Sequence, residues 1–393
     1  MRDVVIVDSV RTGLAKSHRG SFNMTAPADM LGHLIKALMK RNPEVNPEEI
    51  GDCIVGTGLP GGPQGFNIGR IATVVGELPI TVSGQTVSRY CSSGLQAIST
   101  AANQIASGYD EIILAGGCET ISMLKTPNMT NAMNPTVGKA QPGIYLPMGQ
   151  TAETVAQRYG VTREAQDEMA LLSQQRVAAA QEQGLFKDEI IPMTVTYSKK
   201  DKMTGEITQI ETTVDSDECN RPTTTIEGLA KLSPSFNPTG TVTPGNSSQL
   251  ADGASICLMM SAEKAKELGL KPKAYFRGFA VAGCSPDEMG VGPVFAVPKL
   301  LKAAGLTVDD IDIWELNEAF ASQAVYCRDT LGIDSAKLNP NGGSIAVGHP
   351  YGMTGSRLVG HAARELQRRK LKYAVITMCV GGGMGAAGLI EAC

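Results

Sequence analysis

The chain carries the same run of secondary-structure signals twice. LIKALMKRNPEVNPEEIGDCIVG (34–56) and VPKLLKAAGLTVDDIDIWELN (297–317) each read as an amphipathic helix, an acidic turn and then a strand. Further along, each copy has a turn of small residues that opens a helix, in SSGLQAISTAANQIA and in MTGSRLVGHAARELQ. A strand ending in glycines follows both helices, in DEIILAGGCE and in KYAVITMCVGGG. Because several elements recur in the same order, the chain is predicted to contain two copies of one α/β unit, at 1–120 and 270–393.

Short apolar runs in these copies are typical of parallel strands that are buried on both faces. The runs at 4–7, 112–115 and 374–377 are continuous rather than alternating, and helical patterns lie between them, which indicates an α/β architecture. The intervening segment, 121–269, begins with Met, Pro and Asn and then carries a helix, TREAQDEMALLSQQRVAAAQEQG, with Thr162 as its expected cap. An insertion between two repeats often forms a lid or a substrate-binding loop, so an inserted domain is expected here.

Composition argues against several classes of protein. A net charge of −4 gives no reason to expect nucleic acid or an acidic membrane surface as a partner. Nine cysteines without a CxxC pair argue against a disulfide framework and a structural zinc site, and favour reduced thiols. No run of about 18 apolar residues is present that could span a membrane. A strand at the very start leaves no room for a signal peptide, and the chain ends IEAC rather than SKL, so a soluble cytoplasmic protein is expected.

Cys91, in SRYCSSGLQAI, precedes a small-residue turn that opens a helix. The positive end of a helix dipole favours a thiolate, and hence a nucleophile. The alternative is a buried structural cysteine, which suits Cys53 and Cys257 within apolar runs. Arg89 and the serines make the surroundings of Cys91 polar, which favours the nucleophile.

The second cysteine of interest, Cys379, ends the last buried strand and leads into three glycines. A dinucleotide-binding loop would need a helix after these glycines, and the remaining chain is too short for one. The glycines instead expose backbone N–H groups beside a thiol, as an anion-stabilising site requires. Asn317 and Glu318 follow the corresponding strand of the second copy, where ligands commonly bind; a helix-capping role for Asn317 is the alternative.

His349 lies between a glycine and a proline in NPNGGSIAVGHPYGMTGSRLVGH, although the chain has only four histidines. His33 and His361 fall in helical patterns, and His18 lies in a polar stretch. The glycines indicate a backbone that bends or approaches something closely. On its own, a turn histidine that bonds a backbone carbonyl remains the alternative.

Together these motifs resemble the thiolase family over essentially the whole chain. The matching stretches are CSSG at Cys91, NEAFA at 317–321, GHPxG at 348–352 and CxGGGMG at 379–385. The resemblance implies a thiolase fold, with two duplicated α/β halves, each a mixed five-stranded sheet between helices, and an inserted loop domain that covers coenzyme A. It also implies a homodimer or homotetramer that acts on acyl-CoA and CoA, with CoA as a substrate and with no permanently bound cofactor or metal.

The same resemblance implies catalytic roles for six residues. Cys91 would be the nucleophile, His349 would activate it, and Cys379 would be the acid and base for the departing or attacking group. His349 and a water held by Asn317 would stabilise the enolate. The backbone N–H groups of Cys91 and Gly381 would form an oxyanion hole. Glu318 would orient His349 or its neighbours.

For CoA, the family pattern implies Arg221 near the adenosine phosphates and Ser248 at the pantetheine amide. Met148 and Phe320 would line the pantetheine channel, and Phe236 would pack beside it. The lysines between 199 and 202 are read as a solvated charge run instead.

The substrate class is indicated by smaller differences. Acetoacetyl-CoA thiolases tend to have His-Met-Gly where this chain has Pro147-Met148-Gly149, and CASG in place of CSSG. The chain therefore resembles the degradative 3-ketoacyl-CoA thiolases of fatty acid β-oxidation, with a biosynthetic acetoacetyl-CoA thiolase as the alternative. Tyr351 and Met353 are bulkier than the usual residues, and ETIS replaces ESMS at 119–122.

Two other kinds of protein share this fold. A condensing enzyme of the ketoacyl synthase type would have two histidines, or a histidine and an asparagine, and no second catalytic cysteine, so Cys379 argues against it. A non-catalytic acyl-CoA binder would be expected to lack at least one of the four chemical groups, and all four are present.

Overall fold

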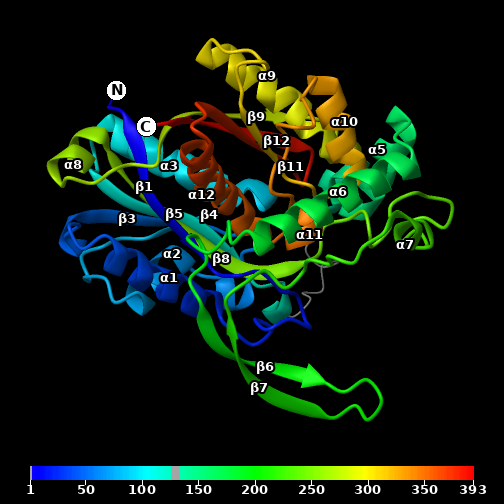
Figure 1. The fold of residues 1–393 in the computed structure, drawn as a ribbon, viewed down its shortest axis with the longest axis horizontal. Coiled ribbons are helices and arrows are strands. Elements are labelled where there is room, and N and C mark those ends of the chain that lie inside the picture. The colour runs from blue at the N-terminus through cyan, green and yellow to red at the C-terminus, as the bar shows by residue number, and fades with distance from the viewer. Residues whose placement is uncertain (1, 125–132) are drawn as a thin grey trace.

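The computed structural model describes residues 2–124 and 133–393. These residues form one long mixed sheet, with helices on its outer faces and between its two halves (Figure 1). The sheet order is β10-β11-β12-β9-β1-β8-β5-β3-β4, and the short β2 pairs with β8. The strands are β1 (Val4–Arg11), β2 (Ala15–Lys16), β3 (Ile50–Gly56), β4 (Gln85–Val87), β5 (Ile112–Glu119), β8 (Ala251–Ser261), β9 (Ala274–Gly283), β10 (Ile313–Leu316), β11 (Tyr373–Val380) and β12 (Met384–Ala392).

The duplication predicted from the sequence is visible in this sheet. In the N-terminal half, β3 is parallel to β4 and β5, and β8 runs antiparallel between β5 and β1. In the C-terminal half, β10 is parallel to β11, and β12 runs antiparallel between β11 and β9. A short pairing of β1 with β9 joins the halves. The N-terminal half has the predicted five-stranded mixed sheet, whereas the C-terminal half has four strands and an isolated bridge between Trp314 and Leu338.

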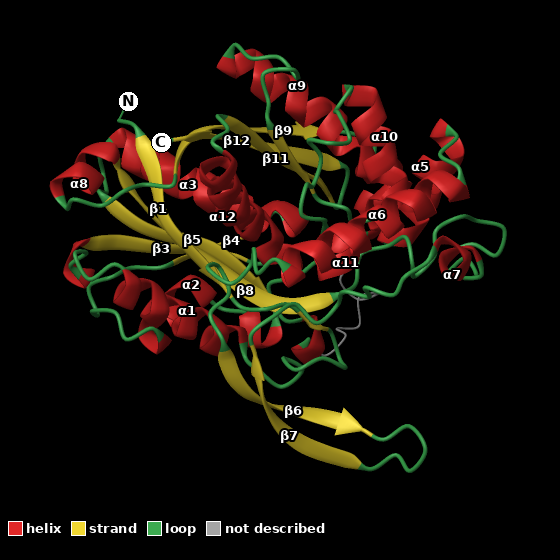
Figure 2. Cartoon of the chain, viewed as in Figure 1, coloured by secondary structure: helices red, strands yellow, loops and turns green. Residues whose placement is uncertain are grey.

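Two equivalent helices pack together at the centre of the molecule. They are α3 (Ser93–Ser107) and α12 (Tyr351–Arg369), the helices of the two sequence copies, and they lie between the two halves (Figure 2). Ile98 and Ala102 of α3 belong to the same buried cluster as Val359 and Ala362 of α12. Small residues allow this close packing, and both helices begin at the same region of the molecule.

The other helices cover the outer faces of the sheet or belong to the insertion. They are α1 (Pro27–Arg41), α2 (Ile68–Val75), α4 (Pro135–Ala140), α5 (Met148–Tyr159), α6 (Arg163–Glu182), α7 (Ile226–Ala230), α8 (Ala262–Glu267), α9 (Gly292–Ala304), α10 (Ala321–Leu331) and α11 (Ser344–Val347). As predicted, Thr162 caps α6, because its side chain accepts the N–H of Ala165. None of the described helices is both long enough and apolar enough to cross a bilayer.

The predicted boundaries of the insertion, 121–269, need correction. The insertion contributes a two-stranded hairpin of β6 (Met193–Lys200) and β7 (Ile207–Val214), which extends from the body in Figure 1. However, β8 falls within the same range and is fully buried between β1 and β5. The sheet of the N-terminal half is therefore completed by a strand that comes after the insertion, which the repeat pattern alone did not reveal.

Candidate active site

The start of α3 presents Cys91 inside the protein. Cys91 lies in a 3₁₀ turn, Tyr90–Ser92, that leads directly into the helix. Tyr90 has a positive φ of 43°, a conformation that a non-glycine residue adopts only when its surroundings hold it there. Ser93 helps to do so, since its Oγ accepts the N–H of Arg89 at 2.8 Å and lies 2.7 Å from the carbonyl oxygen of Tyr90.

The protonation of Cys91 differs from the thiolate expected at a helix start. Burial raises the pKa of the Cys91 thiol to about 12, and nearby Glu119 adds to this, while the backbone N–H groups of Gly381 and of Cys91 itself act in the opposite sense. The loss of hydration therefore outweighs the helix end, and Cys91 is a thiol at rest. The interaction between the Gly381 N–H and the Cys91 sulfur places Gly381 where an oxyanion hole was predicted.

Cys379, at the end of β11, faces the same space as Cys91. Burial raises the pKa of its thiol well above the ordinary cysteine value, and the proximity of Cys91 raises it further. Its Sγ donates to Oε1 of Gln323 at 3.4 Å, and that oxygen also accepts the N–H of Ala319. Gln323 was not identified from the sequence, although it lies two residues after the NEAFA motif. Both cysteines are thus held as neutral thiols.

The ring of His349 is held by polar side chains on both sides. Nδ1 lies 2.7 Å from Oγ1 of Thr354, and Nε2 lies 3.3 Å from Nδ2 of Asn317. Ser344 donates to Oδ1 of Asn317 at 2.5 Å, so the amide nitrogen of Asn317 is the atom that faces the ring. Because an amide nitrogen only donates, Nε2 must be the unprotonated acceptor and Nδ1–H must donate to Thr354.

These contacts decide two of the alternatives left open by the sequence. The ring of His349 bonds side chains rather than a backbone carbonyl, and only its main-chain N–H reaches one, that of Gln249. Asn317 does not cap a helix, since α10 begins after Phe320 without a side-chain cap. Burial lowers the pKa of His349 to about 3, and the charge of Arg357 contributes in the same direction, so the imidazole is neutral.

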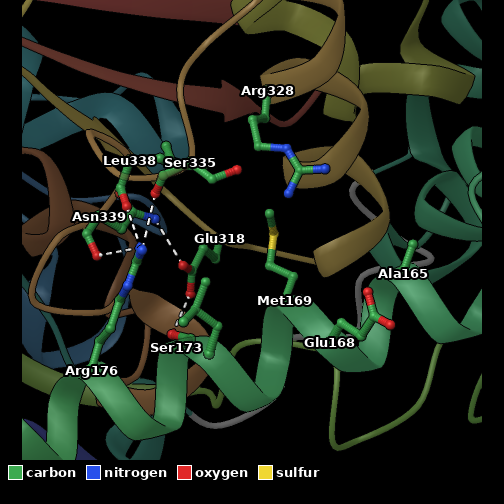
Figure 3. Close-up of a pocket in the computed structure, with 11 residues that line it drawn as sticks. Ala165, Glu168, Met169, Ser173, Arg176, Glu318, Arg328, Ser335, Leu338 and Asn339 are labelled. Carbon is green, nitrogen blue, oxygen red and sulfur yellow. Dashed lines mark hydrogen bonds between the residues drawn. The ribbon is translucent and has the colours of Figure 1, made fainter.

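The side chain of Glu318 is bound by groups other than His349. Its carboxylate accepts hydrogen bonds from Ser173 at 2.7 Å, from Asn339 at 2.8 Å and from the N–H of Ile345 at 3.3 Å. It lines a cavity of about 180 Å³ between α6 and α10 (Figure 3). Of the two predicted roles, orienting His349 itself or orienting its neighbours, the contacts of Glu318 agree with the second. Glu318 holds the chain next to Ser344, the residue that orients Asn317.

The five residues predicted to bind CoA do not all gather in one place. Met148 and Phe320 pack against the buried cluster that contains Cys379. The ring of Phe236 meets that of Phe320 edge-on at 6.1 Å between centroids, and the N–H of Ser248 bonds the carbonyl of Ala319.

Arg221 is placed differently, because its side chain is exposed at the surface. Lys16 lies nearby, and its pKa is lowered by partial burial and then by the positive charges of Arg221 and Arg19. Arg221 therefore belongs to a surface cluster of three cations, whereas the other four residues lie in or beside the cluster that contains Cys379.

The two bulky residues of the histidine loop lie in different environments. The ring of Tyr351 meets that of His349 edge-on at 5.1 Å, and the pKa of its phenol is raised by burial and by proximity to Cys91. Tyr351 therefore shares the space around the nucleophile. Met353 is fully buried with Leu14, Cys219 and Ala251 in a separate apolar cluster.

The fold and the site together define a class of α/β enzymes in which two duplicated halves meet around a pair of cysteines. Comparison with known proteins supports this assignment along the whole chain. The model of the thiolase N-terminal domain matches residues 4–263, and that of the thiolase C-terminal domain matches residues 270–392. The chain belongs to the thiolase family, as predicted from its motifs.

Individual relatives are similar over nearly their full length. The 3-ketoacyl-CoA thiolase of Bacillus subtilis is 45% identical, with 100% of each chain covered. The human peroxisomal 3-ketoacyl-CoA thiolase is also 45% identical, over 99% of this chain and 91% of its own. The crystal structure of the Bacillus anthracis acetyl-CoA acetyltransferase superposes with a TM-score of 0.90 at 37% identity, covering 100% of this chain and 99% of that one. The predicted thiolase fold and acyltransferase class are therefore confirmed.

Proposed function

We propose that this protein is a degradative 3-ketoacyl-CoA thiolase, which uses CoA to cleave a 3-oxoacyl-CoA into acetyl-CoA and a shortened acyl-CoA through an acyl-Cys91 intermediate. The observation that carries the proposal is the proximity of two buried thiols, Cys91 and Cys379, with the Gly381 N–H beside Cys91. The neutral imidazole of His349 is linked to them through Tyr351, whose ring contacts that of His349 and lies near Cys91. The names of the relatives from Bacillus subtilis and from human support the degradative subclass.

In the first half-reaction, Nε2 of His349 takes the proton of the Cys91 thiol, and the thiolate attacks the 3-keto carbon. The bond between C2 and C3 breaks, the acyl group stays on Cys91, and the acetyl-CoA enolate takes its proton from the Cys379 thiol. The unprotonated Nε2 required here is the one that the contacts with Thr354 and Asn317 impose.

In the second half-reaction, the Cys379 thiolate takes the proton of the CoA thiol, and the CoA sulfur attacks the acyl carbon on Cys91. The Cys91 thiolate leaves and recovers its proton from His349. All protons and electron pairs return to their starting positions, so no bound cofactor is consumed and CoA acts as a substrate.

Two sets of hydrogen-bond donors would stabilise the charged species. The N–H groups of Cys91 and Gly381, which already favour a negative sulfur, face the oxyanion that forms after attack. His349, once protonated by Cys91, and a water held by Asn317 would face the enolate oxygen. The same donor cannot serve both oxyanions at once, so two separate sites are required.

The CoA molecule would enter along Met148, Phe236 and Phe320, with Ser248 beside the pantetheine arm. Its phosphates would meet the surface cations of Arg221 and Lys16. We further propose a homodimer or homotetramer located in the cytoplasm.

The decisive experiment is the Cys91→Ser variant, assayed for loss of 3-oxoacyl-CoA in the presence of CoA. We expect it to abolish thiolysis, because a serine hydroxyl is far less acidic than a thiol. Mass spectrometry of the native protein after incubation with acetyl-CoA should find the acyl group on the Cys91 peptide. An acyl group on Cys379 instead would contradict the assignment.

A biosynthetic acetoacetyl-CoA thiolase is the second candidate, favoured by the Tyr351 side chain beside Cys91 and by the similarity to the Bacillus anthracis acetyl-CoA acetyltransferase. The degradative proposal predicts that kcat/KM for thiolysis rises from the four-carbon to the eight-carbon substrate. Each added methylene contributes up to about 0.8 kcal/mol if it is buried. A profile that peaks at acetoacetyl-CoA and falls at six carbons would assign the protein to the biosynthetic class.

A further inference from the structure

One buried carboxylate outside the predicted site, that of Glu119, binds three separate segments of the chain. Glu119 is the last residue of β5 and is fully buried. Its Oε2 accepts the N–H of Gly58 at 2.7 Å and the N–H of Gly352 at 2.8 Å. Its Oε1 accepts the N–H of Leu59 at 3.2 Å and the side-chain amide of Gln64. Among the described residues, no lysine or arginine forms an ion pair with it.

The Gly352 contact reaches the element that carries the histidine. Gly352 lies in the first turn of α12, three residues after His349, and its N–H is one of those that a helix start leaves without an internal partner. A carboxylate at this position also interacts favourably with the positive end of a long helix. Glu119 therefore holds the start of α12 at one fixed place.

The Gly58 and Leu59 contacts reach the element that carries the nucleophile. These residues follow β3, and the carbonyl of Thr57, just before them, lies 3.2 Å from Oγ of Ser93 at the Cys91 turn. Gly58 packs closely against both the histidine loop and the cysteine turn. A Cβ on Gly58 would lie 2.6 Å from Cβ of Tyr351 and 3.3 Å from the Tyr90 carbonyl oxygen. The loop at 57–59 is thus packed between the cysteine turn and the histidine loop.

We propose that Glu119 is a positioning residue that sets the distance between Cys91 of the N-terminal half and His349 of the C-terminal half, by binding the support of each with the same carboxylate. This inference rests on the proposed function, in which Nε2 of His349 takes the Cys91 proton. Each of the two oxygens receives at least two donors. In either orientation, a glutamine at this position would point its NH₂ group, which only donates, at N–H groups that also only donate.

The variant Glu119→Gln keeps the size of the side chain and tests this role. We expect kcat/KM for thiolysis to fall roughly 100-fold, as for a reacting pair displaced by about 1 Å, with little change in KM. The matched control is Glu365→Gln, which removes a buried carboxylate further along α12 that binds Arg368 and Arg369. The control should retain activity within about threefold, because its contacts do not reach the site.

A double-mutant cycle separates positioning from general damage to the fold. If Glu119 acts through His349, Glu119→Gln should cost less than about threefold in a His349→Ala background, because the group it positions is already gone. An equal loss of roughly 100-fold in both backgrounds would overturn the proposal. Where Glu119→Gln does not fold, Glu119→Asp takes its place in the cycle, since it keeps the charge but is one methylene shorter.

A second readout makes the result independent of the overall reaction. The rate at which iodoacetamide alkylates Cys91, followed by mass spectrometry, reports how well the thiol is deprotonated. Because the charge of Glu119 itself raises the pKa of Cys91, the variant used here is Glu119→Asp, which keeps that charge. We expect it to slow this rate in the native background and to leave it unchanged in His349→Ala. A native protein without thiolase activity would refute the proposed function alone, whereas alkylation slowed equally in both backgrounds would refute the role of Glu119.

Discussion

At the scale of single residues, burial rather than charge attraction determines the resting state of the site. The thiols of Cys91 and Cys379 and the imidazole of His349 all have pKa values displaced toward their neutral forms. In the proposed mechanism, proton transfer from Cys91 to His349 would therefore create charge only when the substrate is present to use it. The residues that choose the tautomer of His349 are consequently as important as the ring itself.

The first prediction concerns Thr354, the acceptor of the Nδ1–H of His349. Thr354→Val keeps the shape of the side chain but removes the acceptor, so the ring loses one contact that selects its tautomer. We expect kcat to fall roughly tenfold, the equivalent of about 1.4 kcal/mol for one hydrogen bond, with KM little changed. Thr354→Ser retains the hydroxyl and should restore the native rate. Equal rates in the native and valine proteins would refute the tautomer assignment.

The second prediction follows from the lowered pKa of His349. As pH falls below the ordinary histidine value, the unfolded chain gains a proton that the folded chain does not bind until about pH 3, so stability is lost toward acid pH. Between about pH 7 and pH 5, the native protein should lose about 2 kcal/mol more than His349→Gln does. Urea unfolding at fixed protein concentration measures the difference. Parallel curves for the two proteins would show that the pKa is not lowered.

At the scale of elements, the two central helices position the chemistry by where they begin. Cys91 lies two residues before α3, and His349 lies two residues before α12, so both groups stand at the starts of the paired helices. The ends of β10 and β11 supply Asn317 and Cys379 at the same edge. This arrangement depends on the backbone of α12 approaching the sheet very closely.

The third prediction tests that close approach. A Cβ on Gly352 would lie 2.3 Å from the carbonyl oxygen of Cys118 and 2.6 Å from that of Gly56, so Gly352→Ala must shift the start of α12. We expect a loss of about 1–3 kcal/mol in unfolding free energy, together with reduced activity. Gly138→Ala is the control, because Gly138 also lies in a helix but has open space around it. The control should be neutral or stabilising by up to about 1 kcal/mol.

At the scale of the whole molecule, one continuous sheet joins the halves, and its two ends are β10 and β4. The end strand β4 is partly exposed, and the nearby Ile80 is 80% exposed. Exposed edge strands are commonly covered by another chain, and symmetric pairing of identical edges is the usual way.

The fourth prediction is therefore an oligomer built from this 41.3 kDa chain. Light scattering coupled to size-exclusion chromatography should give the mass of two or four chains. A proline at Thr86, in the middle of β4, is expected to weaken the association, because proline lacks the N–H that an added strand would use. A native protein that elutes as a single chain would contradict the prediction.

The sequence by itself determined the duplicated α/β core and the family, and it singled out the candidate residues for the chemistry. It could do so because repeated patterns and glycine-rich turns are local, and because strand ends and helix starts of equivalent units meet at one edge. Cys91, Asn317, His349 and Cys379 could all be recognised in this way. Only the tertiary structure decided that β8 belongs to the N-terminal sheet, that Glu318 bonds Ser173, Asn339 and the N–H of Ile345, and that the two thiols are neutral. Strand order, side-chain direction and burial depend on atoms that are distant in the sequence, and for the same reason the contacts of Glu119 became visible only in the folded chain.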